Sequence, residues 1–384
     1  MRAMKRTLLL AMLGSIFLAP ACGGGNGGNA KPSKPRVSSK APSSKAEAKT
    51  EAKPGAQPEK AQAWEWTLPP GITAPLVPED NPMSADKVAL GHQLFMDKRL
   101  SVDGSRSCYS CHQNQHGGAD GRKTALGAAN KELTRNTPTI WNVGLHKEFY
   151  WDGRAPSLEK QAIGALQGGN MGLGEALASK AAEIGALPEY QDAFATVFGL
   201  GDDAQVEPDH IAKALSAYER TLLCGDTGYD QQKLSEAQKR GQALFMGKAG
   251  CMTCHNGPNF SDGIYHVTGI AIDPQAEGAD VGRSKVSEDD AHKFAFKTPS
   301  LRNVTNTAPY FHDGSVDSLE EAVTLMAGGG KPQEGLSVDA NLLDRKLTED
   351  EVGDIVAFLG ALGCSGELEV IGDQSAEGIA PPQG

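Results

Sequence analysis

The sequence predicts a mostly α-helical protein built from two similar domains, and three observations support this. The chain has 384 residues, which is long enough for two domains. Apolar residues recur at three- and four-residue intervals in several segments, whereas strand-like alternation is scarce. A set of short motifs occurs twice in the same order, which indicates an internal duplication. The predicted helices are 88–95, 211–223, 234–245, 319–326 and 348–362.

The duplicated motifs keep their register. Gly91 opens a Gly-His-Gln-Leu-Phe-Met segment, and Gly241 opens Gly-Gln-Ala-Leu-Phe-Met. Further along, a Thr-Pro pair, an Asn-Val pair, an aromatic-x-Asp-Gly motif and a Ser-Leu-Glu segment recur in both copies without gaps between them. Chance similarity does not hold register over such a length, so each copy is predicted to form one domain. We place the two domains at 64–224 and 225–366.

The spacing of cysteine and histidine identifies a cofactor. Each copy carries one Cys-x-x-Cys-His motif, the pattern that attaches a c-type haem through two thioethers and supplies an iron-ligating histidine. A thioredoxin-like redox pair does not need the histidine, and a zinc site would require the two domains to share ligands. We therefore predict two cytochrome c-like domains, each with one covalent haem. The residues are Cys108, Cys111 and His112 in the first domain, and Cys251, Cys254 and His255 in the second.

The two copies differ where a second iron ligand would be expected. Met326 follows Leu319 by seven residues, and its counterpart in the first copy is Ala165. A methionine sulfur as the second axial ligand raises a haem potential, although a helical methionine can also be ordinary core. We predict a closed, high-potential haem at His255 and Met326, and a more accessible haem at His112.

The N-terminus has the features of an export signal. Residues 1–22 combine basic residues, a short apolar stretch and small residues before Cys22. Cleavage near Ala21 is one interpretation, and lipidation of Cys22 is the one we prefer, because a Gly-rich tether follows at once. Residues 23–63 and 367–384 are predicted to be a disordered linker and a flexible tail. These features predict a location in the periplasm or cell envelope.

Charge and the remaining cysteines add two expectations. The formal net charge is −11, and many basic residues lie in the predicted linker, so the domains are acidic. This argues against nucleic acid as a partner and is compatible with a basic protein partner. Cys224 and Cys364 each follow a predicted helix, and an oxidising compartment would favour a disulfide between them. Sequence alone leaves open whether they lie close enough.

Three segments together resemble the bacterial di-haem cytochrome c peroxidase family, which includes MauG. They are Phe-Tyr-Trp-Asp-Gly-Arg at 149–154, Pro-Ser-Leu-Arg-Asn-Val at 299–304 and Ala-Pro-Tyr-Phe-His-Asp-Gly at 308–314. The resemblance covers about 80–364. It implies a peroxidatic haem in the N-terminal domain, an electron-entry haem in the C-terminal domain and a calcium ion between them. It also implies hydrogen peroxide as substrate and a small cytochrome c or cupredoxin as electron donor. A homodimer is a further expectation.

The resemblance assigns roles to individual residues. It makes Met326 the axial ligand of the C-terminal haem iron, Trp151 the residue between the haems, and Gln161 a residue of the distal pocket. Calcium suits hard oxygen ligands, two of which would be backbone oxygens. The implied calcium ligands are Asn136, Thr307 and Pro309.

Two departures from the family pattern bear on activity. The family's distal histidine is absent from the loop 127–130, which reads Gly-Ala-Ala-Asn. We therefore expect an open N-terminal haem that needs no reductive activation. His116 and His146 are spare histidines that could ligate iron, and we expect both at the surface. The family's distal glutamate corresponds to Asn170 in this chain. We predict that Asn170, Gln161 and Trp151 are catalytic residues. An amide cannot shuttle a proton as a carboxylate does. Glu159 and Glu175 are two candidates to substitute for it, although no motif singles out either.

Three functions fit these residues. The first is a peroxidase that reduces hydrogen peroxide to water with electrons entering at the C-terminal haem. The second is a MauG-like oxidase that modifies aromatic residues of a partner protein through a high-valent iron state. The third is a non-catalytic electron carrier with two closed haems. High-spin iron in the resting protein separates the first two from the third, and peroxide-dependent turnover with reduced cytochrome separates the first from the others.

Overall fold

The computed structural model describes residues 64–201 and 203–368. The predicted signal segment 1–22, the linker 23–63 and nearly all of the tail 367–384 therefore lie outside the described residues. Within the described part of the chain, no helix is long and apolar enough to cross a membrane.

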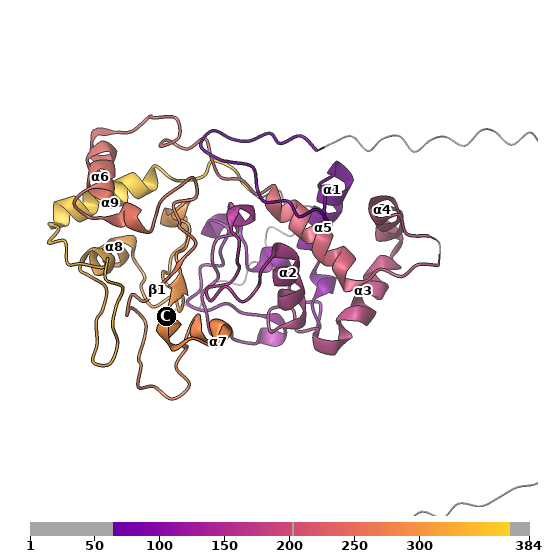
Figure 1. Cartoon of the computed structure of the whole chain (residues 1–384). Helices are drawn as coiled ribbons and strands as arrows, with labels where there is room; N and C mark the ends of the chain where they lie inside the picture. Colours follow the sequence, from indigo (N-terminus) through magenta and orange to yellow (C-terminus); the bar gives the residue numbers. More distant parts are fainter. Residues whose placement is uncertain (1–63, 202, 369–384) are drawn as a thin grey trace, which may run out of the picture. The chain divides into compact units, whose positions relative to one another are not determined.

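The described chain is mostly helical, as predicted, with long loops between the helices (Figure 1). All five predicted helical segments form helices, with ends shifted by a few residues: α1 and α5 in the first half, and α6, α8 and α9 in the second. The helices α2, α3, α4 and α7 were not predicted individually. The helices are α1 Ala85–Met96, α2 Leu158–Gln167, α3 Leu177–Gly185, α4 Pro188–Phe198, α5 Pro208–Arg220, α6 Glu236–Met246, α7 Ser284–Ser287, α8 Leu319–Ala327 and α9 Glu349–Gly360.

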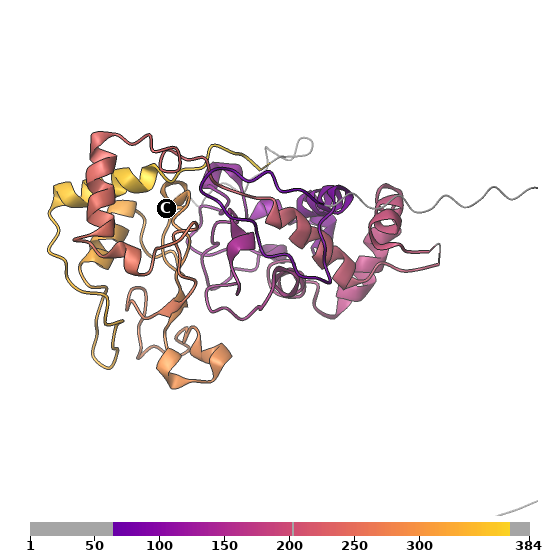
Figure 2. The same cartoon turned by 45° about the horizontal axis from the view of Figure 1, so that its top comes forward.

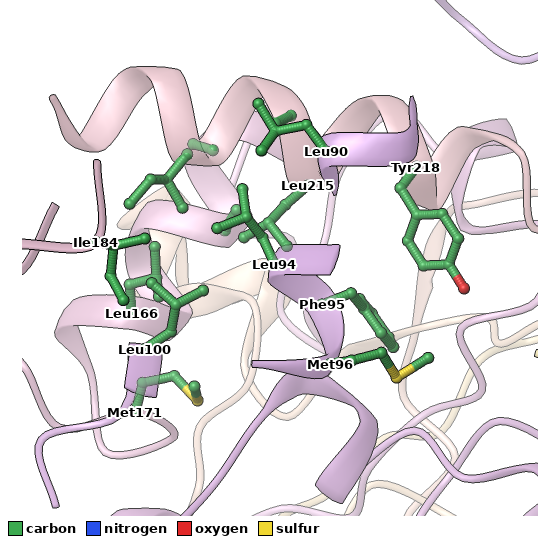
Figure 3. Close-up of a cluster of buried hydrophobic side chains, with 14 of the residues drawn as sticks. Leu90, Leu94, Phe95, Met96, Leu100, Leu166, Met171, Ile184, Leu215 and Tyr218 are labelled. Carbon is green, nitrogen blue, oxygen red and sulfur yellow. The ribbon is translucent and has the colours of Figure 1, made fainter. Parts of the chain in front are cut away.

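The core of the N-terminal half forms where α1 crosses α5. Gly91 allows this close crossing, because a Cβ there would lie 2.0 Å from the carbonyl oxygen of Ala214. Leucines on the facing sides of the two helices are fully buried, and Figure 3 shows Leu94 of α1 and Leu215 of α5 in one apolar cluster. This burial removes apolar area from water and stabilises the pair.

The C-terminal half repeats the crossing with α6 and α9, which lie together in both views (Figures 1 and 2). A Cβ at Gly241 would lie 1.8 Å from the carbonyl oxygen of Asp354, the counterpart of Ala214. Phe358 takes the place of Tyr218 beside the glycine. The same packing at corresponding positions is consistent with the predicted duplication.

Extended structure is scarce, also as predicted. The strands β1 (Tyr265–His266) and β2 (Phe296–Lys297) form one antiparallel pair, in which Tyr265 is opposite Lys297. The backbone N–H of Lys297 also donates to the carbonyl oxygen of Trp151, at 2.8 Å. This short pair therefore holds a segment of the C-terminal half against the loop that carries Trp151.

Cys224 and Cys364 form a disulfide, which settles the alternative that sequence left open. Each follows the last core helix of its half, and an asparagine side chain receives each backbone N–H. The Cys224 N–H donates to Oδ1 of Asn142 at 2.7 Å, and the Cys364 N–H donates to Oδ1 of Asn303 at 3.3 Å. The bond therefore joins corresponding points of the two halves.

Candidate haem sites

The first Cys-x-x-Cys-His motif folds into a tight turn that aims its histidine inward. Cys108 begins a 3-10 helix, and its carbonyl oxygen accepts the backbone N–H groups of Cys111 and His112, each at 3.1 Å. Nδ1 of His112 lies 2.8 Å from the carbonyl oxygen of Gly118, so it must donate there. Nε2 then keeps its lone pair for a metal. Burial lowers the pKa of His112, which keeps the ring neutral.

The second motif repeats this geometry. Cys251 also begins a 3-10 helix and accepts the backbone N–H of His255, at 2.9 Å. Nδ1 of His255 lies 3.0 Å from the carbonyl oxygen of Phe260, which again leaves Nε2 with its lone pair. Burial lowers the pKa of this imidazole as well. In both motifs a backbone carbonyl thus orients the imidazole and leaves Nε2 for a metal.

The four motif cysteines suit covalent attachment. They are free thiols, while the other two cysteines of the described chain form the disulfide. Cys108, Cys111 and His112 line a cavity of about 1410 Å³. A wide, largely apolar cavity with two thiols and a neutral imidazole on its wall fits a haem group. In such a pocket the bound haem would supply an iron that binds peroxide and exchanges electrons.

The cavity also gathers most of the residues that the family resemblance singled out. Gln161 and Ala165 project from α2, and the chain after α2 brings Asn170 to the same wall. The roles of these residues stay predictions, but their shared location is what a distal pocket requires. The predicted site residues on the wall are Trp151, Gln161, Asn170, Asn136, Thr307 and Pro309.

Trp151 and the proposed calcium ligand Asn136 are directly connected. The indole Nε1 of Trp151 donates to the carbonyl oxygen of Asn136 at 3.0 Å. The side-chain nitrogen of Asn136 donates to the carbonyl oxygen of Arg122 at 2.8 Å. The backbone N–H of Asn136 donates to the carbonyl oxygen of His312, also at 2.8 Å. Because His312 belongs to the second repeat, Trp151 is anchored at the junction of the two halves.

Met326 lies near the end of α8, partly buried. It packs beside a small apolar cluster that includes Ile270 and Val316. Tyr310 contacts both this cluster and the core cluster that Cys251 joins. These contacts place Met326 in the C-terminal half, and its ligation of iron stays a prediction.

The loop that lacks the family's histidine packs against the distal wall. The backbone N–H of Ala128 donates to the carbonyl oxygen of Asn170 at 2.8 Å. Of the two spare histidines, His116 packs against Gly121, whereas His146 lines the cavity. His146 was expected at the surface, but it is partly buried, and Nδ2 of Asn259 lies 3.2 Å from its Nε2. Burial lowers the pKa of His146 to about 3.

A cluster beside the second motif has the composition of a metal site. One ligand atom each from Cys254, Asp262 and His266 lies within 4.8 Å of the others. Hydrogen bonds to Cys254, Asp339 and Asp262 outweigh burial and raise the pKa of His266 to about 10. Because Cys254 belongs to the haem-attachment motif, we interpret this cluster as surroundings of the second haem.

Neither of the two glutamates proposed to replace the family carboxylate is suited to the task. Nη1 of Arg220 lies 2.8 Å from Oε1 of Glu159 in an ion pair, and hydrogen bonds to Arg220 and Asn81 outweigh burial and lower the pKa of Glu159. Glu175 is exposed. Sequence reasoning missed Glu219, which is buried and lines the cavity. Comparison of the two repeats could have found it, because Leu359 is its counterpart.

Two helical halves, each with an inward-facing Cys-x-x-Cys-His motif, define a di-haem c-type cytochrome. The comparisons agree. Residues 85–239 match the family model "Di-haem cytochrome c peroxidase", and 238–363 match the model "Cytochrome c". The chain belongs to the di-haem cytochrome c peroxidase family, and its cofactors are of the haem c type.

Individual relatives carry two kinds of name. Methylamine utilization protein MauG of Methylorubrum extorquens is 38% identical over 74% of this chain and 80% of that protein. Cytochrome c551 peroxidase of Pseudomonas aeruginosa is 36% identical over 73% of this chain and 80% of that protein. A crystal structure of a MauG-like protein associated with microbial copper homeostasis is 32% identical, with a TM-score of 0.73, and covers 80% of this chain and 97% of that one.

Proposed function

We propose that the protein reduces hydrogen peroxide to water at the N-terminal haem, with electrons that enter at the C-terminal haem. The observation that carries this proposal is the shared cavity wall. His112 lies on it together with Gln161 and Asn170, and Ala165 lies where the second repeat has Met326. An alanine cannot ligate iron, so this side chain would leave the iron of a bound haem accessible to substrate.

The residues divide the work in the proposed reaction. His112 holds the iron of the N-terminal haem, and Gln161 offers an amide that can orient a bound peroxide. Trp151 lies at the junction of the halves and would carry electrons between the haems, with Met326 and His255 holding the second iron. A calcium ion at Asn136, Thr307 and Pro309 would keep this junction rigid.

Peroxide-dependent oxidation of a reduced small cytochrome c or cupredoxin tests the proposal. We expect two donor molecules to be oxidised for each peroxide consumed, and high-spin ferric iron in the electron paramagnetic resonance spectrum before any reductant is added. Two low-spin haems in that spectrum would contradict the open site, and His146 would then be the first ligand to test. If the resting iron is high-spin but peroxide does not oxidise the donor, the peroxidase function is contradicted.

A second candidate is a MauG-like oxidase that oxidises aromatic residues of a partner protein. The relative named MauG and the missing distal histidine at 127–130 favour it. The two candidates make different predictions for the same experiment. A MauG-like oxidase would consume peroxide without oxidising the cytochrome and would alter a protein substrate instead.

We also propose export to the periplasm or cell envelope, with a lipid anchor at Cys22. The short apolar segment before this cysteine supports the proposal. Labelling of cells with radioactive palmitate should mark the protein, and Cys22→Ser should lose the label. Label retained in this variant would contradict the anchor. A separate part of the proposal is that the protein forms a homodimer, and light scattering measures its mass in solution.

A further inference from the structure

Glu219 is a buried carboxyl group that the proposed haem ligands and distal residues do not explain. It is the second-last residue of α5, with 6% of its surface exposed, and it lines the cavity that His112 faces. Its Oε2 has no hydrogen-bond partner among residues 64–201 and 203–368. A buried, unpaired carboxylate is costly, so such a group is either protonated or serves a purpose that offsets the cost.

The neighbours of Glu219 place it close to the haem-attachment turn and to the distal wall. Burial is the largest cause that raises the pKa of the Cys108 thiol, and the negative charge of Glu219 is the second. Burial also raises the pKa of Tyr150, and Glu219 adds a smaller contribution there. The hydroxyl of Tyr150 donates to the carbonyl oxygen of Gln161 at 3.0 Å. Glu219 therefore lies within electrostatic reach of both sides of the pocket.

The cation next to Glu219 in the chain is already engaged elsewhere. Arg220 forms its ion pair with Glu159, and its Nε donates to the carbonyl oxygen of Leu76 at 2.8 Å. Burial raises the pKa of Glu219 to about 8, Arg220 opposes this shift, and the charge of Glu159 adds to it. Burial thus favours the protonated form of Glu219 at neutral pH.

Helix packing does not require an acid at this position. The corresponding residue of α9 is Leu359, which is buried to a similar extent. The neighbouring pair Tyr218 and Phe358 supports the correspondence, because each packs against the crossing glycine of its half. In the C-terminal half an apolar residue packs at the same point of the helix crossing. The carboxyl group of Glu219 is therefore specific to the half that would bind substrate.

We propose that Glu219 supplies the proton for peroxide cleavage, the role that Asn170 cannot fill. The proposal rests on the peroxidase function above. The O–O bond breaks as two donor molecules supply one electron each. The Glu219 carboxyl passes its proton to the departing oxygen, which leaves as water. A second proton from solvent completes the other water, and solvent then reprotonates Glu219.

Glu219→Gln keeps the shape of the side chain and removes its transferable proton. General acid catalysis contributes about 10²–10⁴-fold, so we expect peroxide cleavage to slow by at least about 10²-fold in the stopped flow at pH 7. Adding Asn170→Glu to this variant should restore part of the rate. Glu175→Gln changes an exposed glutamate off the cavity and should leave the rate unchanged. If Glu219→Gln reduces haem content, Glu219→Leu, which copies Leu359, must show the same slowing.

A second measurement does not depend on turnover. The infrared spectrum of the resting protein at pH 7 should contain a carbonyl band of a protonated carboxyl that Glu219→Gln removes. This acid has a folded-state pKa of about 8, above its ordinary value of 4.5. The folded protein therefore holds an extra proton between these pH values. Its free energy of unfolding should fall, relative to Glu219→Gln, as pH rises through that window.

The outcomes separate this inference from the function on which it rests. If the wild type reduces peroxide and Glu219→Gln cleaves it at the same rate, the inference is overturned and the peroxidase function stays intact. A missing carboxyl band, or stability that rises with pH relative to the variant, would overturn it as well. A wild-type protein that does not reduce peroxide would overturn both.

Discussion

The two haem-binding halves share one framework and differ at positions that bear on the haem. Each half crosses two helices at a glycine and orients its histidine through a backbone carbonyl. The first half has Ala165 and Glu219 where the second has Met326 and Leu359. The lesson is that the backbone plan tolerates both sets of residues. We expect these few side chains to decide the chemistry of each haem, and changing them tests the comparison.

The largest effect is expected from the attachment cysteines. Cys108→Ser with Cys111→Ser should remove the N-terminal haem and abolish peroxide reduction. Cys251→Ser with Cys254→Ser should remove the other haem and abolish oxidation of the donor. Mass spectrometry of the denatured wild-type protein should show two haem additions, and each double variant should show one. A wild-type mass with one addition or none would remove the basis of the comparison.

Exchanging the residues at the predicted axial position should reverse the difference between the haems. Ala165→Met is expected to close the N-terminal haem, turn it low-spin and suppress its reaction with peroxide. Met326→Ala should lower the potential of the C-terminal haem by an appreciable part of the about 0.8 V that axial ligands span. Potentiometric titration followed by visible spectroscopy measures both changes. An unchanged potential in Met326→Ala would leave this residue as core packing.

Buried charge in the C-terminal half offers a contrast with Glu219. Asp230 and Arg302 form an ion pair at 2.6 Å, with 1% of each side chain exposed. Burial tends to raise the pKa of Asp230, but its hydrogen bonds to Arg302 and Thr227 outweigh this and lower it. Asp230→Asn would leave a buried cation unpaired and should cost about 3–5 kcal/mol of unfolding free energy.

The two acids should therefore shift stability in opposite directions with pH. The stabilisation from Asp230 is present above its ordinary pKa of 3.8 and is lost as pH falls through the lower folded-state value. Denaturant unfolding from pH 3 to pH 8 measures this for wild type, Asp230→Asn and Glu219→Gln. Identical pH profiles for the wild type and Asp230→Asn would show that the pair does not stabilise the fold.

The smallest effect is expected from the disulfide that joins the halves. Cys224→Ser with Cys364→Ser should lower the unfolding free energy by about 2–5 kcal/mol, because the unfolded chain loses a long-range constraint. The haem content should not change, since the four motif cysteines remain. Calorimetry measures the loss. If haem is lost as well, the disulfide also protects the attachment sites.

Much of the fold could be predicted from local patterns. The Cys-x-x-Cys-His motifs hold both thiols and the histidine within five residues, so no long-range contact is needed to recognise them. The helices follow from apolar spacing, and the contrast between Met326 and Ala165 follows from aligning the repeats. These features depend on residues close in sequence or on the internal repeat, and a single sequence is enough to predict both.

Tertiary structure alone decided the rest. The Cys224–Cys364 bond depends on how two distant helix ends meet, which their spacing does not reveal. Glu159 and Glu219 both lie on helices, but one ends in an ion pair with Arg220 and the other on the cavity wall. Sequence determined which residues carry the chemistry of haem attachment. Packing between segments far apart in the chain determined which carboxyl group is buried beside the pocket, because burial depends on neighbours that sequence does not specify.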